Sequence, residues 1–152
     1  MALNRKACLY TNEGRKIIHD KLKINYNLLY QLMNQKISNS SIEYYDNRIS
    51  LYSAQCGKCY ITGKEFQSLE DMHCHHKIAK SKGGTDEYLN LVLVDKDVHI
   101  LIHAMDMEVI KHYLELLQIK SIELRKLNRL RQLLELPIII KKKSLHLSYN
   151  YE

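Results

Sequence analysis

Histidine is the residue type through which this sequence suggests chemistry. The chain holds eight histidines, and six of them lie between positions 73 and 112: His73, His75, His76, His99, His103 and His112. In a helix, His99 and His103 would lie over one another on one face, because residues four apart are neighbours there. Imidazoles gathered in this way bind a divalent metal or take up a proton near neutral pH.

Hydrolysis of a phosphodiester bond needs both of these properties. A metal ion stabilises negative charge on the phosphate and the leaving oxygen, while a neutral imidazole deprotonates the attacking water. A hairpin that carries His75 and His76 and packs on the later helix would bring the two histidine pairs together. Strict strand alternation would send His75 and His76 to opposite faces. Both then serve one site only if the backbone is irregular there, or if the ligands come from the end of the hairpin.

The segments that must position these histidines follow the order strand, loop, strand, helix. Residues 72–78 are expected to form the first strand, and the apolar run 91–94 the second. Residues 80–85 predict a loop between them, because two adjacent glycines adopt positive φ at little cost. Asp95 is a favourable N-cap for a helix that runs to about Ala104.

Further helices are expected on both sides of this unit. Ser40 followed by Glu43 is a capping-box pattern, and it predicts a helix over 41–54. Apolar residues at helical spacing predict three more helices: an interrupted one over 14–37, one capped by Asp106, and one from Ser121 that ends before Pro137. Five glycines and one proline also favour helices over an all-β fold.

Composition excludes several classes of protein. The 152 residues are 45 % hydrophobic and 26 % charged, which suits one packed domain. No run approaches the ~20 apolar residues that cross a bilayer, and the N-terminus lacks the apolar region of a secretory signal. We therefore expect an intracellular protein, in the bacterial cytoplasm or an organelle, with no membrane partner.

The net charge of +6 is unevenly distributed. Lys and Arg outnumber acidic residues by seven to two over 1–40 and by eight to three over 120–152, whereas acidic residues dominate over 41–119. Basic flanks around an acidic, histidine-rich centre suit a protein that holds a polyanion on both sides of a cation site. Lysines that merely solvate helix faces are the alternative, and charge alone does not decide between the two.

The order of these motifs resembles the HNH nuclease family, whose fold is called ββα-metal or His-Me finger. The matching residues are His75-His76-Lys77, Gly83-Gly84-Thr85, Asn90-Leu91 and His99-x3-His103. The resemblance implies an α+β fold with a ββα-metal core and flanking α-helices. It also implies an endonuclease that hydrolyses DNA with a divalent metal ion.

A longer stretch, from about residue 7 to about residue 136, is similar to the C-terminal DNA-binding and endonuclease region of group II intron reverse transcriptase/maturases. It includes residues 41–50, Cys56-x2-Cys59, residues 73–76 and residues 97–104. This likeness implies strand nicking linked to intron mobility, with intron RNA or a reverse transcriptase/maturase in trans as further partners. The chain is too short for the reverse transcriptase part, so we expect the nuclease end alone.

The HNH resemblance implies a role for each matching residue. His75 and His99 take the positions of metal ligands, and His76 takes that of the general base that activates water. Asn90 matches the asparagine that ties the loop and positions the base. His103 matches an additional helix histidine that serves as a further ligand or a phosphate contact in catalysis.

Two further expectations concern the lysines of the loop beside the site and the identity of the metal ion. Lys77, Lys80 and Lys82 are expected to contact DNA phosphates. The expected cofactor is a divalent ion, Mg²⁺ or Mn²⁺, with Zn²⁺ or Ni²⁺ as alternatives. Imidazole ligands favour Zn²⁺, Ni²⁺ or Mn²⁺, whereas Mg²⁺ prefers oxygen.

Cys56-x2-Cys59 predicts a separate feature. Cysteines in a chain without a secretory signal are poor disulfide candidates. Many HNH relatives combine such a pair with a second one near the last motif histidine, in a structural Zn(Cys)4 site. Residues 94–98 hold no cysteine here. Two alternatives stay open: a structural Zn²⁺ bound by Cys56 and Cys59, or two small residues in a tight turn.

We divide the chain into three parts. Residues 1–40 form a basic, helical, DNA-binding-like segment, residues 41–136 the HNH endonuclease domain, and residues 137–152 a basic tail for which disorder stays open. The alternative function is a non-catalytic zinc-knuckle module that binds nucleic acid, or a decayed remnant of an intron protein. In that alternative the basic ends bind and the histidines are vestigial.

Overall fold

The structure is a computed structural model that describes residues 12–13, 16, 24–35, 38 and 40–141. Its α-helices are α2 (Tyr26–Asn34), α3 (Ile42–Ala54), α4 (Lys96–His103), α5 (Met107–Leu116) and α6 (Ser121–Leu133). Its strands are β1 (Met72–His76) and β2 (Leu91–Asp95), joined by a loop with short 3-10 turns at Lys80–Lys82 and Tyr88–Asn90. The expected order of strand, loop, strand and helix is confirmed.

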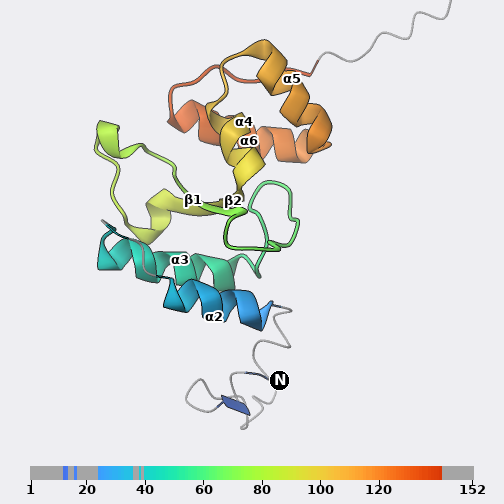
Figure 1. The fold of residues 1–152 in the computed structure, drawn as a ribbon. Coiled ribbons are helices and arrows are strands. Elements are labelled where there is room, and N and C mark those ends of the chain that lie inside the picture. Colours follow the sequence, from blue (N-terminus) through green and yellow to red (C-terminus); the bar gives the residue numbers. More distant parts are fainter. Residues whose placement is uncertain (1–11, 14–15, 17–23, 36–37, 39, 142–152) are drawn as a thin grey trace, which may run out of the picture.

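The two strands form an antiparallel sheet between two layers of helices. Met72 pairs with Asp95 and His76 with Leu91, so β1 and β2 are in register along their whole length. The sheet lies between α3 on one side and α4 on the other (Figure 1). Because both faces are covered, four consecutive apolar residues of β2 are buried, as their unbroken apolar pattern requires.

A turn region before β1 supports the free edge of β2. Lys58 and Glu65 form an isolated antiparallel bridge there. The Tyr60 amide donates to the carbonyl of Leu93 at 3.0 Å. The Gln55 side-chain amide donates to the same carbonyl at 2.9 Å and accepts from the Leu93 amide at 2.9 Å. These groups take the place of a third strand.

Side-chain caps begin the helices close to the expected positions. Asp95 Oδ1 accepts from the Asp97 amide at 2.9 Å and starts α4, and Asp106 caps α5 in the same way. The cap of α3 is Ser41, whose Oγ accepts from the Tyr44 amide at 3.0 Å. The cap therefore lies one residue later than the expected Ser40. Local hydrogen bonding thus fixes where the histidine-bearing helix α4 begins.

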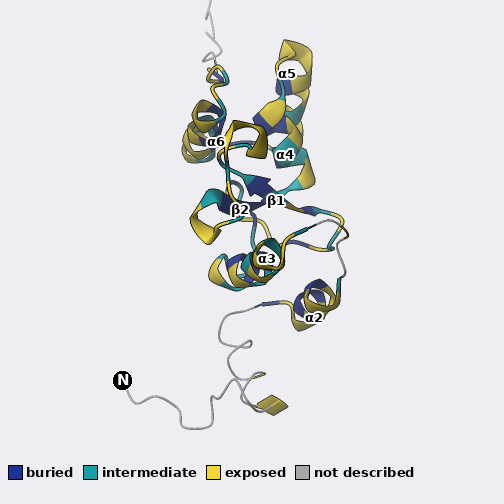
Figure 2. Ribbon diagram, turned by 90° about the vertical axis from the view of Figure 1, so that its left-hand side faces the viewer, coloured by how far each residue is buried: buried dark blue, intermediate teal, exposed yellow. Residues whose placement is uncertain are grey.

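The core surrounds the sheet and continues under α6. Figure 2 shows the apolar run of β2 in the buried colour, and α6 contributes Leu127 and Leu130. Part of the expected tail also packs: Ile139 is buried, and its backbone exchanges two hydrogen bonds with the Asn128 side chain, at 2.8 and 2.9 Å. Residues 137–141 therefore belong to the folded unit. The rest of the tail, 142–152, lies outside the described residues.

The N-terminal segment is described only in part. The interrupted helix expected over 14–37 corresponds to α2, and Asn25 serves as its N-cap by accepting from the Leu28 amide at 3.2 Å. Apart from residues 12–13 and 16, the chain before residue 24 lies outside the described residues, so the expectation of a DNA-binding-like segment stays a prediction. No helix in the described part is both long and apolar enough to cross a membrane.

Candidate metal centre

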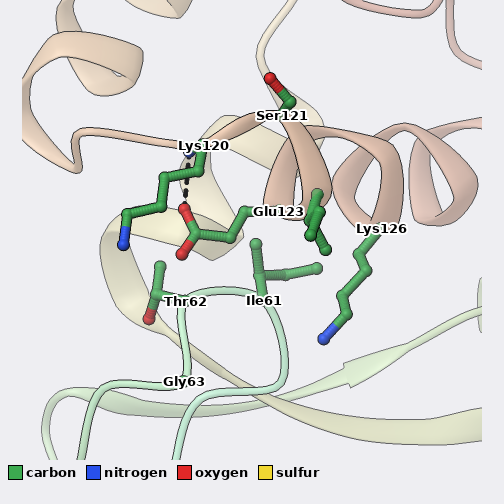
Figure 3. Close-up of a pocket in the computed structure, with 8 residues that line it drawn as sticks. Ile61, Thr62, Gly63, Lys120, Ser121, Glu123 and Lys126 are labelled. Atoms are coloured by element: carbon green, nitrogen blue, oxygen red, sulfur yellow. Dashed lines mark hydrogen bonds between the residues drawn. The ribbon is translucent and has the colours of Figure 1, made fainter.

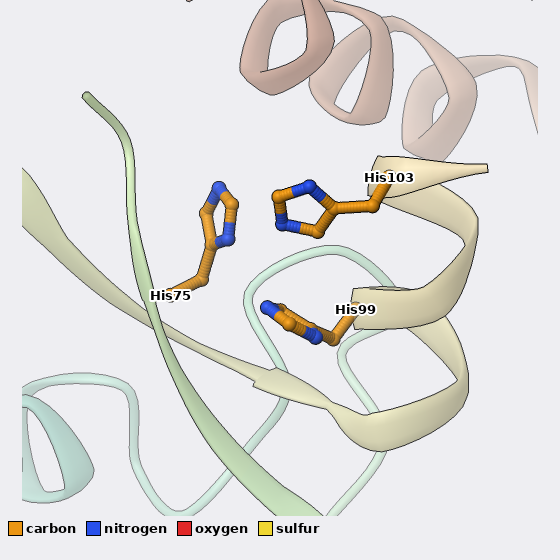
Figure 4. Close-up of side chains that lie close together, drawn as sticks. All are labelled: His75, His99 and His103. Atoms are coloured by element: carbon orange, nitrogen blue, oxygen red, sulfur yellow. The ribbon is translucent and has the colours of Figure 1, made fainter. Parts of the chain in front are cut away.

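Three histidines from β1 and α4 face one another. His75 lies on β1, while His99 and His103 follow one another by one turn on α4. One ring nitrogen of each lies within 4.8 Å of the others. The ring centroids are 5.4 Å apart for His75 and His99, 5.3 Å for His75 and His103, and 4.8 Å for His99 and His103. Figure 4 shows the three rings directed into a common space.

Burial keeps these imidazoles neutral. Burial, helped by the nearby rings of His99 and His103, lowers the pKa of His75 to about 3. Burial and the neighbouring His103 lower the pKa of His99 to about 4. The pKa of His103 is also lowered, by burial and then by the charge of Arg131. Neutral imidazoles offer lone pairs to a cation, so the electrostatics suit metal ligation.

An unpartnered nitrogen of His75 indicates whether a cation suits this cluster. His75 is 2 % exposed, and its buried Nε2 has no hydrogen-bond partner in the described structure. Leaving a buried polar atom unpaired costs about 1–3 kcal/mol. A divalent cation held by three imidazoles would satisfy that atom, and nitrogen donors of this kind suit Zn²⁺ and Ni²⁺ better than Mg²⁺. The donor set fits a transition-metal ion.

Strand alternation separates His76 from this cluster. The His73 ring stacks on His99 of α4 with centroids 5.1 Å apart, so His73 and His75 both face α4. The His76 ring instead stacks on Tyr44 of α3, with centroids 5.7 Å apart and planes 5° from parallel. The backbone stays in a regular strand through His76. The structure thus brings His75, His99 and His103 together and places His76 on the opposite side of the sheet.

His76 forms a pair with a carboxylate that the sequence did not single out. Its Nε2 lies 2.8 Å from Oδ1 of Asp86, in the loop between the strands. Asp86 also accepts from Ser41 Oγ at 2.6 Å and from Lys80 Nζ at 2.9 Å. These hydrogen bonds, that of His76 foremost, hold the pKa of Asp86 far below its usual value. An acidic residue directly after the glycine loop was the signal available in the sequence.

The ionised carboxylate determines which nitrogen of His76 carries the proton. A carboxylate only accepts hydrogen bonds, so Nε2 of a neutral His76 donates to Asp86 and Nδ1 keeps the lone pair. Within the described structure, Nδ1 has no hydrogen-bond partner. The His76 side chain is 21 % exposed. It can therefore receive a proton from a water molecule.

Asn90 ties the loop as the resemblance implies. Its Oδ1 accepts from the Ile78 amide at 2.8 Å, and its Nδ2 donates to the carbonyls of Ile78 at 3.1 Å and Thr85 at 2.8 Å. Gly84 completes the closure, since a Cβ there would lie 1.8 Å from the Ile78 carbonyl oxygen. Asn90 thus acts on the loop that carries Asp86. Its further role in positioning the base stays a prediction.

The three lysines expected at DNA phosphates make contacts within the chain. Lys77 Nζ donates to the carbonyl of Leu89 at 2.8 Å, and Lys80 pairs with Asp86. Lys82 pairs with Glu135. Lys80 and Lys82 keep about half of their side chains exposed, at 57 % and 45 %. Their contact with DNA stays a prediction.

The cysteine pair lies in a tight turn. Cys59 is buried, and its Sγ accepts from the Asp95 amide at 3.3 Å. Cys56 has a positive φ of 53° and Gly57 one of 67°. Within the described residues, the three histidines are the only set of three or more metal-ligating side chains that converge. A structural Zn²⁺ at Cys56 and Cys59 gains no third ligand there.

Two larger hollows lie away from the histidines. One, of about 510 Å³, lies between the turn at residues 61–63 and the start of α6, where the Glu123 side chain accepts from the Lys120 amide at 2.7 Å (Figure 3). The other, of about 1060 Å³, is an apolar groove between α5 and residues 137–141. No histidine of the cluster lines either hollow, so the chemistry-bearing site is distinct from both.

Comparison with known protein families gives a match for one segment of the chain, which we call the HNH segment. Residues 56–99 match the family model of HNH endonucleases. The HNH segment contains both strands, the loop and His75, His76, Asn90 and His99, whereas His103 lies just beyond its end. The expected ββα-metal core with flanking helices is therefore confirmed. No curated protein and no solved structure matched the chain.

The HNH segment indicates metal-dependent nuclease chemistry, and nucleases of this kind act on DNA. It agrees with the cluster of imidazoles, because the two ligand positions implied by the resemblance, His75 and His99, belong to that cluster. His103 lies beside them as a third ring, and its role as a further ligand or a phosphate contact stays a prediction. The HNH part of the expected resemblance is thus supported.

Proposed function

We propose that this protein is a DNA endonuclease that holds a divalent metal ion with His75, His99 and His103. The observation that carries the proposal is the convergence of one ring nitrogen from each of three neutral imidazoles, His75 among them with a buried, unpartnered Nε2. The match of residues 56–99 to HNH endonucleases supplies the reaction class. When bound, the ion would stabilise negative charge on the phosphate and on the leaving oxygen.

His76 is the base in this proposal. The Asp86 carboxylate fixes the tautomer of His76 and stabilises the imidazolium formed when Nδ1 takes a proton from the attacking water. Tyr44 holds the ring in its plane by stacking. Because the His76 ring is not one of the three that converge, its removal should leave metal affinity intact while scission is lost. His76 is the last residue of β1, so in this proposal the scissile phosphate lies at the end of the hairpin, within reach of both faces of the strand.

Nicking of supercoiled plasmid DNA tests the proposal. The purified protein is incubated with Mn²⁺, Mg²⁺, Zn²⁺ or Ni²⁺ in turn, and open-circular product is measured. We expect His99→Ala to abolish both metal binding and nicking, and His76→Ala to lower nicking by about 100-fold or more with metal binding unchanged. His112→Ala removes an exposed histidine of α5 and is the matched control.

Two outcomes would contradict this function. Wild-type protein that nicks DNA with none of the four ions is not the proposed nuclease. Protein that binds DNA equally well with and without His76, and never nicks it, is a nucleic-acid-binding module. That second outcome corresponds to the alternative considered for the sequence.

We further propose that the nick serves group II intron mobility. Support comes from the resemblance of residues 7–136 to the C-terminal region of the intron proteins. The freed 3′-hydroxyl would then prime a reverse transcriptase supplied in trans. Addition of intron RNA and a reverse transcriptase/maturase to the nicking reaction should yield DNA extended from the nick. Nicking that is insensitive to both additions would contradict the link.

A further inference from the structure

Arg131 is a buried charge that connects α6 to the end of α4. It is 1 % exposed, and within the described residues it has no carboxylate partner. Its Nη1 donates to the carbonyl oxygens of Leu101, Ile102 and Ala104 at 3.0, 2.9 and 2.7 Å. Its Nε donates to the carbonyl of Pro137 at 2.9 Å. One guanidinium therefore joins three segments of the chain.

The carbonyls that it binds are those that a helix leaves unpaired. The last turn of an α-helix has carbonyl oxygens with no partner inside the helix. Helix α4 has only eight residues, and its C-cap, Ala104, is extended rather than left-handed, so the usual glycine closure is missing. A cation at this end is also favoured by the helix dipole. Arg131 thus caps α4 from another helix.

This cap acts on the turn that carries a metal-binding ring. His103 is the last residue of α4 and lies between Ile102 and Ala104, two of the residues whose carbonyls Arg131 holds. The apposition of His103 to His75 on β1 depends on the position of that last turn. Helix α6 is outside the segment that matches HNH endonucleases, so the match does not include this support.

We infer that Arg131 is a positioning residue that holds the last turn of α4 so that His103 faces His75 and His99. The inference rests on the proposed function, because it assigns Arg131 a part in that metal site. It also makes α6 a part of the site. Without the guanidinium, three carbonyls lose their donor and the last turn frays, which moves the third ligand away from the other two.

Cobalt titration of variants tests the inference. Co²⁺ alone is the probe, since its visible absorption reports the geometry of its ligands. Arg131→Met keeps an unbranched apolar stem and removes every donor. We expect at least a tenfold loss of Co²⁺ affinity, within the 10- to 100-fold range typical of groups that orient metal ligands, and an altered spectrum. Arg131→Lys restores one charged donor and should recover part of the affinity.

Asn128→Ala is the matched control on the same helix. It breaks the two hydrogen bonds to Ile139, and the Asn128 side chain makes no hydrogen bond to α4. It should lower stability while leaving Co²⁺ affinity and spectrum unchanged. The inference is overturned if folded Arg131→Met binds Co²⁺ as the wild type does, if Asn128→Ala loses as much affinity, or if neither Arg131 variant folds, since Arg131 is then simply structural.

A metal-free measurement separates this inference from the proposed function. Amide hydrogen exchange is followed without any metal in the wild type and in Arg131→Met. Faster exchange confined to the last turn of α4 supports positioning by Arg131, and equal acceleration across all helices overturns it. If the wild type binds no Co²⁺, the metal site itself is wrong, while the exchange data still decide whether Arg131 holds α4.

Discussion

His75 and His76 have different environments because successive side chains of a strand point to opposite faces. His75 faces α4, is buried, and has a pKa lowered to about 3, so it stays neutral, as the proposed ligand role requires. His76 faces α3 and is held by Asp86 and Tyr44. Alternation along β1 therefore divides the proposed ligand and the proposed base between the two faces of one sheet. Asp86 links His76 to the loop.

Removal of the Asp86 charge should lower the free energy of unfolding by an amount that depends on pH. The folded-state pKa of Asp86 is depressed, so its stabilising effect is present above its unfolded pKa of about 3.9 and is lost as the pH falls through the folded value. We expect Asp86→Asn to lower the free energy of unfolding by about 1–3 kcal/mol near pH 7. The difference from wild type should narrow below about pH 4.

Urea unfolding at several pH values measures this effect. Asp46→Asn, which alters an exposed carboxylate of α3, is the control and should change stability by less than about 0.5 kcal/mol. A difference for Asp86→Asn that is the same at pH 7 and at low pH would show that its hydrogen bonds do not depend on the charge.

At the scale of elements, α4 is set by contacts at both of its ends. Asp95 begins it with a side-chain cap, and Arg131 ends it with a cap from α6. Between them Val98, Leu101 and Ile102 are buried, which fixes the rotation of the helix and directs His99 and His103 to β1. The helix is too short to be stable by itself. Its caps and its packing must supply the order that the site needs.

Loss of the first cap should weaken both the fold and the site. We expect Asp95→Ala to lower the free energy of unfolding by about 1 kcal/mol, because an amide at the N-terminus of α4 loses its acceptor. Asp95→Asn keeps an acceptor and should lose much less. Thermal unfolding followed by circular dichroism measures both variants. Equal losses in the two would indicate that the carboxylate charge, and not capping, is what matters.

Local signals predicted most of these elements. The glycine pair, the apolar run of β2 and the acidic caps each act within a few residues, so the strand–loop–strand–helix unit and its histidines could be predicted from the sequence. Contacts between distant positions could not. Asp86 meets Ser41, and Arg131 meets Leu101, through folding that no local pattern encodes. The N-cap of α3 is Ser41 instead of the expected Ser40, so the sequence pattern located the start of this helix only to within one residue.

At the scale of the whole molecule, a two-stranded sheet is stabilised by helices on both faces. Two strands alone are marginally stable in water. Here α3, with α2 packed against it, covers one side, and α4, with α6 packed against it, covers the other, which gives the short sheet a core on each face (Figure 1). The histidine cluster lies on the α4 side and the His76–Asp86 pair on the α3 side. The complete fold, and not the HNH segment alone, positions both.

The central claim is that His75, His99 and His103 form one metal site, and calorimetric titration with Zn²⁺ or Ni²⁺ tests it most directly. We predict one ion bound per chain at this site. His75→Ala and His103→Ala should each weaken that binding by more than about 100-fold, while His112→Ala leaves it unchanged. A wild-type chain that binds neither ion, or a His75→Ala variant that binds as tightly as the wild type, would contradict the claim.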